Sequence, residues 1–234
     1  WEKFGLEYAG PVIYAVAKWV DEMVKKDKIE EIIFIGRDCY TVKKAFDLIN
    51  SSSIESIYLH ATRSMYTALN GFEERIKTTT HLGEDLNTVL TTLRCYKGSN
   101  DFLAKNTPTT IRNAAEGSAF IRNNIDMYRD LSEKAKIKYT EYLRSFKLSD
   151  KELAIVDCCT CFFTSQRFFE NILNKSIKGY YWSIERKKWH KNMPFFSRSC
   201  SFDKKSVKHW SYLFRMLEFI MSSPEQPVLT VDGS

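Results

Sequence analysis

Apolar residues recur with two different spacings in the first sixty residues. Every third or fourth residue of 8–27 is apolar and the charges lie on the opposite face, which predicts an amphipathic helix with Pro11 in its first turn. The apolar run at 31–35 predicts a buried strand, 41–50 has helical spacing again, and 56–61 predicts a second strand. Strand, loop, helix and strand in this order predict a right-handed βαβ unit.

Residues from about 66 to 148 follow a different pattern. They are polar and rich in Thr and Asn, and 117–147 has a spacing that predicts one or two helices. The earlier pattern then resumes, with strands expected at 152–157 and 177–184, a loop at 158–165, and helices at 166–174 and 206–221. The whole chain, 1–234, is therefore predicted to be a single α/β domain. It would have a mostly parallel, Rossmann-like sheet, helices on both faces, and a helical insertion or cap at about 66–148.

Composition indicates a folded chain outside the membrane. Hydrophobic residues make up 44% of the 234 residues, and 16 Phe, 12 Tyr and 5 Trp are ample for a packed core. No apolar run approaches the roughly 18 residues of a membrane span. Charged residues in the first twenty positions argue against a signal peptide. The chain begins at Trp1 without a Met, so we expect it to be cut from a longer chain.

The net charge of +6 leaves several partners open. Basic clusters at 186–191 and 204–208 are typical of a solvated face, but they also suit an anionic substrate or an anionic membrane surface. No nucleic-acid-binding motif is present. The six Cys lack the spacing of a zinc site, which favours reduced thiols in the cytosol. We therefore expect a cytoplasmic protein that can also lie peripherally at the inner membrane.

Two loops are the first candidates for a functional site. In a parallel sheet, ligands bind beyond the carboxyl ends of the strands. The loop after the first strand offers Gly36, Arg37 and Asp38, where the arginine suits phosphate oxygens and the glycine allows a close backbone approach. If the strands at 31–35 and 152–157 are neighbours, this loop and the loop 157–165 face one crevice.

The second loop carries groups that favour an anion. Asp157 ends its strand, and Thr164 and Ser165 place hydroxyls and backbone N–H groups where a helix begins. Arg63 and Ser64, just past the second strand, are expected at the same edge of the sheet and could touch the same ligand. Taken singly, each of these residues could instead make an ordinary ion pair or helix cap.

Five segments also carry a family likeness: GPVIYAVAKWV, IIFIGRDCY, HATRS, IVDCCTCFFTSQ and IKGYYW. Together they resemble the region that follows the haloacid-dehalogenase-like phosphatase domain in bacterial surface-polysaccharide biosynthesis proteins. That region has a strand ending in S-R-D-G, a serine and arginine pair, and a later V-D-x-G before a hydroxyl-rich loop. The resemblance implies a phosphatase domain elsewhere in the same chain.

The same segments resemble the phosphoribosyltransferase fold, and this resemblance implies roles for the loop residues. Arg37 and Asp38 would belong to a pyrophosphate loop, Asp157 would hold ribose hydroxyls or Mg²⁺, and Thr164 and Ser165 would cradle a 5-phosphate. The implied reaction is transfer of 5-phosphoribosyl from phosphoribosyl pyrophosphate, or from another phosphorylated sugar donor, to a glycan acceptor in capsule or O-antigen assembly. Arg37 would stabilise charge together with Mg²⁺, and Asp38 would be the general base.

The chain departs from this pattern at three places. Cys39 stands where the polysaccharide family has glycine, Cys158 stands where phosphoribosyltransferases carry a second acidic residue, and the loop 157–165 contains no glycine. Two alternatives therefore stay open. One is a haloacid-dehalogenase-type phosphatase with Asp38 as nucleophile, although Tyr40 replaces the second acidic residue. The other is a degenerate, non-catalytic binding or scaffold module of a multidomain glycan-synthesis protein.

Overall fold

The computed structural model describes part of the chain in detail. The described residues are 2–51, 54–61, 115, 119, 122–123, 125–148, 150–160, 163–184, 197–199 and 218–224. The chain divides into two compact units, Trp1–Ala61 with Leu148–Pro227, and Thr62–Lys147 with Val228–Ser234. Most of the expected insertion at about 66–148 lies outside the described residues, so its architecture stays a prediction.

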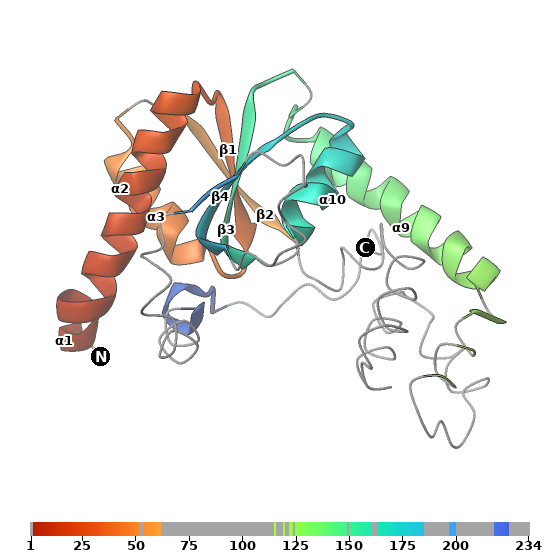
Figure 1. The fold of residues 1–234 in the computed structure, drawn as a ribbon, viewed down its shortest axis with the longest axis horizontal. Helices are drawn as coiled ribbons and strands as arrows, with labels where there is room; N and C mark the ends of the chain where they lie inside the picture. The colour runs from red at the N-terminus through yellow and green to blue at the C-terminus, as the bar shows by residue number, and fades with distance from the viewer. Residues whose placement is uncertain are drawn as a thin grey trace. The chain divides into compact units, whose positions relative to one another are not determined.

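The first unit contains a five-stranded parallel sheet in the order β2-β1-β3-β4-β5 (Figure 1). Its strands are β1 (Glu31–Gly36), β2 (Glu55–His60), β3 (Leu153–Thr160), β4 (Lys178–Ile184) and β5 (Ser197–Ser199). Phe34 of β1 is in register with Tyr58 of β2 on one side and with Val156 of β3 on the other. The expected Rossmann-like α/β fold is thereby confirmed.

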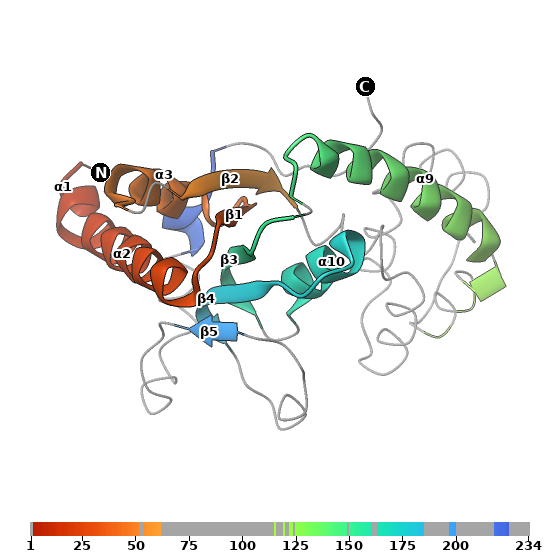
Figure 2. The same cartoon turned by 90° about the horizontal axis from the view of Figure 1, so that it is seen from above.

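Helices cover both faces of this sheet, as Figure 2 shows from above. They are α2 (Gly10–Asp27), α3 (Tyr40–Ile49) and α10 (Thr164–Leu173), and the short α1 (Glu2–Phe4) and the π-helical turn η1 (Gly5–Ala9) precede α2. Apolar residues of α2 and α3 form one core with Phe34, Val156 and Tyr180. The next residue of β4, Tyr181, points to the opposite face, where it contacts α10. The alternation of side chains along β4 thus explains the three-layer arrangement.

Local sequence sets where these helices begin and end. Pro11 lies in the first turn of α2, as predicted. The helix ends at Lys28, which adopts the left-handed conformation with φ 54° and directs the chain into β1. Asn174 ends α10 in the same conformation, which Asn tolerates better than most residues.

Two differences from the sequence prediction concern the strands. Residues 158–160 were expected in a loop, but β3 continues to Thr160 because β4 pairs with it up to Thr160 and Ile184. Strand β5 was not predicted, since three residues are too few for a recognisable alternation. Of the helix expected at 206–221, only the last turn, from residue 218, is described.

The second unit is described mainly through helix α9 (Ile125–Arg144). Ala135, Tyr139 and Leu143 are buried and follow one another at intervals of four residues, so they form one face of the helix. Across the residues described, no helix combines the length and apolar character needed to cross a lipid bilayer.

Candidate functional site

The carboxyl ends of β1 and β3 meet at the point where the strand order reverses. From β1 the chain goes outward to β2, whereas from β3 it goes outward in the other direction to β4, and β1 pairs directly with β3. Ligands of open α/β sheets bind in the crevice that such a reversal creates. The condition set by the sequence, that the strands before the two loops be neighbours, is confirmed.

Arg37 and Asp38 follow β1 at this edge. The Arg37 side chain is 46% exposed, and its Nε lies 3.9 Å from Oδ1 of Asp38. This distance is too long for a hydrogen bond. Arg37 makes no side-chain hydrogen bond to any residue that the structure describes, so its planar set of donors is available to a ligand. The side chain of Asp38 is 29% exposed and therefore within reach of a ligand as well.

Gly36 has a packing reason as well as the predicted functional one. A Cβ atom at Gly36 would lie 3.0 Å from the Tyr58 ring and 3.0 Å from the carbonyl oxygen of Leu59. Both residues belong to β2, the neighbouring strand. The close contact between β1 and β2 therefore accounts for the glycine without any ligand.

Cys39 is part of the core. It is 1% exposed, and its thiol donates a hydrogen bond to the carbonyl oxygen of Val156, 3.3 Å away, which ties the loop after β1 to β3. Burial, followed by the nearby negative charge of Asp157, raises the pKa of the thiol well above its ordinary value. Its φ of −107° is open to any residue, so the backbone does not require a glycine here. A buried neutral thiol is unsuited to act as a nucleophile.

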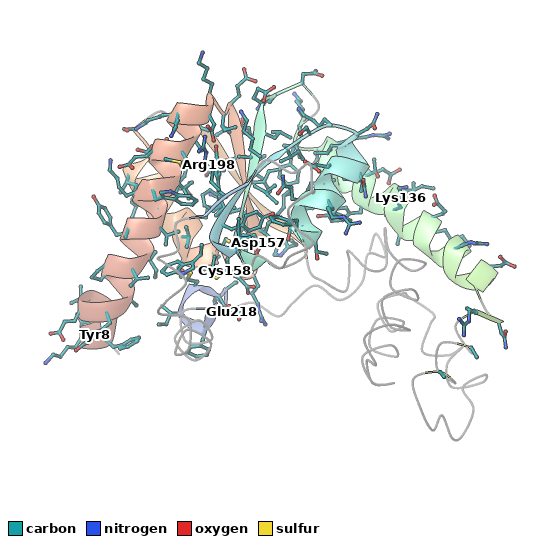
Figure 3. All side chains as sticks on the ribbon, viewed as in Figure 1. Tyr8, Lys136, Asp157, Cys158, Arg198 and Glu218 are labelled. Atoms are coloured by element: carbon teal, nitrogen blue, oxygen red, sulfur yellow. The ribbon has the colours of Figure 1, made fainter. Side chains whose placement is uncertain are left out.

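Asp157 and Ser165 are brought together as predicted for one site. One carboxylate oxygen of Asp157 accepts a hydrogen bond from the backbone N–H of Cys158 at 2.8 Å, and the other accepts one from the Ser165 hydroxyl at 2.5 Å. Ser165 is buried, whereas Thr164 is exposed at the first residue of α10. In Figure 3, Asp157 and Cys158 lie toward the end of the sheet from which the loops emerge.

The turn before α10 has a conformation that is rare for its residue. Phe163 precedes the helix with φ 53° and ψ 35°, in the left-handed region. A bulky residue there is a conformational outlier, because its Cβ crowds the backbone. Its ring is buried and stacks edge-on against Tyr181, with ring centroids 5.7 Å apart. The loop 157–165 contains no glycine, and Phe163 supplies a left-handed residue in it, which core packing holds in place.

Buried hydrogen bonds fix the first turn of α10 to β4. Gln166 accepts a hydrogen bond from the Tyr181 hydroxyl at 3.1 Å and donates one to the carbonyl oxygen of Ile177 at 2.7 Å. Gln166 and Tyr181 are fully buried, and burial raises the pKa of the tyrosine well above its ordinary value. Because Gln166 directly follows Ser165, this network also determines where the Ser165 hydroxyl lies.

A segment from the end of the chain completes this edge, and sequence analysis did not identify it. The backbone N–H of Ser223 donates to the carbonyl oxygen of Arg37 at 3.0 Å, and the Thr41 hydroxyl donates to the carbonyl oxygen of Met221 at 3.1 Å. Met221 is 1% exposed and belongs to the same core as Cys39. Within the described residues, the site therefore has three parts: the loop after β1, the loop after β3, and residues 218–224, whose Glu218 is marked in Figure 3.

The remaining predictions concern residues outside these three parts. Arg63 and Ser64 lie outside the described residues, so their expected place at this edge stays a prediction.

The described part of the chain contains no group of three His, Cys, Asp or Glu residues that could enclose a metal ion. Mg²⁺ usually binds through one or two carboxylates and the substrate's phosphates. The role toward Mg²⁺ expected for Asp157 therefore stays a prediction.

No protein-family model matches the chain, and no curated protein matches its sequence.

Proposed function

We propose that the chain is a phosphoribosyltransferase-like enzyme, which transfers 5-phosphoribosyl from phosphoribosyl pyrophosphate to a sugar hydroxyl in surface-polysaccharide assembly. One observation carries the proposal. The direct pairing of β1 with β3 brings two loops to the point where the strand order of the parallel sheet reverses. One loop carries Arg37 and Asp38, and the other carries Asp157 and Ser165. The resemblance of the same two loops to phosphoribosyltransferases supports this choice of ligand.

The two ends of the donor would bind to different loops. Arg37, whose side chain is exposed and makes no hydrogen bond to the described residues, would contact the pyrophosphate through two parallel N–H groups. Thr164 and Ser165 would contact the 5-phosphate together with the backbone N–H groups of the first turn of α10. A helix N-terminus favours such an anion through its dipole and its unpaired N–H groups.

In the reaction, an acceptor hydroxyl would attack the anomeric carbon of the ribose. Asp38 would take the proton of this hydroxyl, the new C–O bond would form, and the bond to pyrophosphate would break with its electron pair leaving on the pyrophosphate. Arg37 would stabilise the charge that develops on the leaving group. Asp157 would bind the ribose hydroxyls or hold one coordination position of Mg²⁺, whose charge would neutralise the pyrophosphate.

A second candidate, a binding module without catalysis, is favoured by the internal partners of the acidic residues. Both oxygens of Asp157 already accept hydrogen bonds within the protein, and Asp38 lies beside the Ser222 hydroxyl. Such partners can hold the two loops in place without any chemistry. A module of this kind would bind the donor but would not release pyrophosphate from it.

Ligand binding and turnover separate the two candidates. Thermal unfolding with millimolar phosphoribosyl pyrophosphate and Mg²⁺ should raise the melting temperature, and inorganic pyrophosphate and ribose 5-phosphate alone should each do so less. Arg37→Ala and Asp157→Asn should abolish the shift, and the exposed Arg144→Ala should keep it. No stabilisation of the wild type by the donor would rule out the transferase. Binding without release of pyrophosphate in the presence of methyl glycosides would instead indicate the binding module.

A further inference from the structure

The carboxylate of Asp38 lies beside a hydroxyl that is remote in sequence. Oγ of Ser222 is 3.3 Å from Oδ1 of Asp38, although 184 residues separate the two positions. Ser222 is half-buried, and the side chain of Asp38 is 29% exposed. A small molecule at the edge of the sheet can therefore reach both oxygens.

The Ser222 hydroxyl has one proton, and the described residues offer it two acceptors. It lies 2.6 Å from the carbonyl oxygen of Glu218 and 3.3 Å from Asp38. A hydrogen bond between two oxygens is normally 2.5–3.0 Å long, so the proton is directed to Glu218. Lone pairs of Ser222 then remain next to the carboxylate of Asp38. The two oxygens together form a pair of acceptors that can receive further O–H donors.

The pair is held in place by contacts on both sides. On one side, the backbone N–H of Ser223 donates to the carbonyl oxygen of Arg37, the residue directly before Asp38. On the other, the Thr41 hydroxyl donates to the carbonyl oxygen of Met221, directly before Ser222. The spacing of the two oxygens is therefore set before a ligand arrives, which lowers the entropic cost of binding it.

We propose that Asp38 and Ser222 bind two neighbouring hydroxyl groups of the acceptor sugar. The first would donate to Asp38, which takes its proton during transfer, and the second would donate to Ser222. Neighbouring hydroxyls of a pyranose ring are spaced much as these two protein oxygens are. Phe219, in the same segment, is 75% exposed and offers an apolar surface to the C–H face of a sugar ring. Ser222 is thus a binding residue that selects a vicinal diol, and its role as acceptor contact rests on the proposed function.

Sugar binding can be measured without any turnover. We would titrate the ¹⁵N-labelled protein with methyl α-D-mannopyranoside, with and without phosphoribosyl pyrophosphate and Mg²⁺, and follow backbone amide shifts. Shifts are expected at residues 36–41 and 218–224. Ser222→Ala should weaken binding about fivefold, the loss expected for one neutral hydrogen bond, and Ser222→Thr should restore it. Ser176→Ala, an exposed serine at the opposite edge of the sheet, should bind as the wild type does.

Three results would overturn the inference. They are no amide shifts in the wild type at glycoside concentrations up to about 100 mM, shifts confined to another surface, or a Ser222→Ala variant that binds the glycoside as tightly as the wild type does. A glycoside lacking one of the two hydroxyls should bind the wild type as weakly as the intact glycoside binds Ser222→Ala. These results do not depend on the donor titration, so the sugar site can fail while donor binding succeeds, and the reverse.

Discussion

The Ser165 hydroxyl donates a hydrogen bond to the carboxylate of Asp157, and so joins the first turn of α10 to the strand that precedes it. The Asp157 carboxylate also accepts the N–H of Cys158. The carboxylate therefore holds the two ends of the turn in one geometry. This makes Ser165 important for the folded loop, and any ligand contact by Ser165 comes in addition.

Replacing Ser165 and its neighbour Thr164 should separate these two roles. Ser165→Ala removes a buried donor to a charged group and should lower the free energy of unfolding by about 1.5–3 kcal/mol. Thr164→Ala changes an exposed side chain and should alter it by less than about 0.5 kcal/mol. Chemical denaturation measures both values. If the Thr164 hydroxyl holds the 5-phosphate, calorimetry should show weaker donor binding by Thr164→Ala, the variant with unchanged stability.

Replacing Cys39 by glycine should destabilise the protein. Cys39→Gly removes a buried side chain with its hydrogen bond to Val156 and adds backbone freedom before α3, so unfolding should become easier by about 2 kcal/mol. Cys39→Ala should cost about half of this. Equal or greater stability of the glycine variant in urea denaturation would show that this position tolerates glycine. Iodoacetamide should leave Cys39 unmodified in the native wild type, because burial raises its pKa.

An ion pair at the opposite edge of the sheet should control stability in acid. Arg198 of β5 donates to both carboxylate oxygens of Asp27 at 2.5 and 2.7 Å, and this hydrogen bonding lowers the pKa of Asp27 below 3.8 despite its burial. A lowered folded-state pKa contributes stability above the unfolded pKa, and that stability is lost as the pH falls through the folded value.

Asp27→Asn should therefore be less stable than the wild type at pH 7, by about 1–3 kcal/mol, and the difference should shrink below about pH 3.8. Urea denaturation between pH 7 and pH 3 measures this. Glu7→Gln is a suitable control, because the pair of Glu7 with Lys3 is exposed and 3.9 Å long. Its effect should stay within about 0.5 kcal/mol. A constant gap between Asp27→Asn and the wild type across this range would contradict the assigned cause of the pKa shift.

Local patterns were sufficient to predict most of the fold. The Ile-rich run of β1 and the helical spacing of α2 and α3 are properties of a few consecutive residues, and their predicted bounds agree with the structure to within one or two residues. The parallel orientation of β1, β2, β3 and β4 follows because α3, α9 and α10 lie between these strands in the sequence. The neighbouring positions of β1 and β3 were stated only as a condition, since strand order depends on contacts between distant segments.

The parts of the site that could not be predicted depend on distant contacts. Phe163 has a left-handed conformation because Tyr181 holds its ring, and nothing in the loop sequence indicates this. Ser222 reaches Asp38 only because Met221 is buried in the core beside β1 and β3. Neither pair has a recognisable spacing in the sequence. A Ser-Ser-Pro turn after an amphipathic helix, at 222–224, was the one local signal, and it is too common to indicate a site.

Gly179 should link the stability of the core to the geometry of the site. A Cβ atom there would overlap Oε1 of Gln166 and would lie 2.6 Å from Cε2 of Tyr181. Gly179→Ala should therefore lower the free energy of unfolding by about 1–3 kcal/mol, the usual cost of overpacking, and move the first turn of α10. Gln166→Ala removes the overlapping atom, so in a double-mutant cycle the two changes should cost less together than the sum of the single ones. Additive costs would show that Gly179 acts through the backbone instead. If the affinity for the donor changes in the same non-additive way across these variants, the packing of Gly179 against Gln166 also affects the loop that contains Ser165.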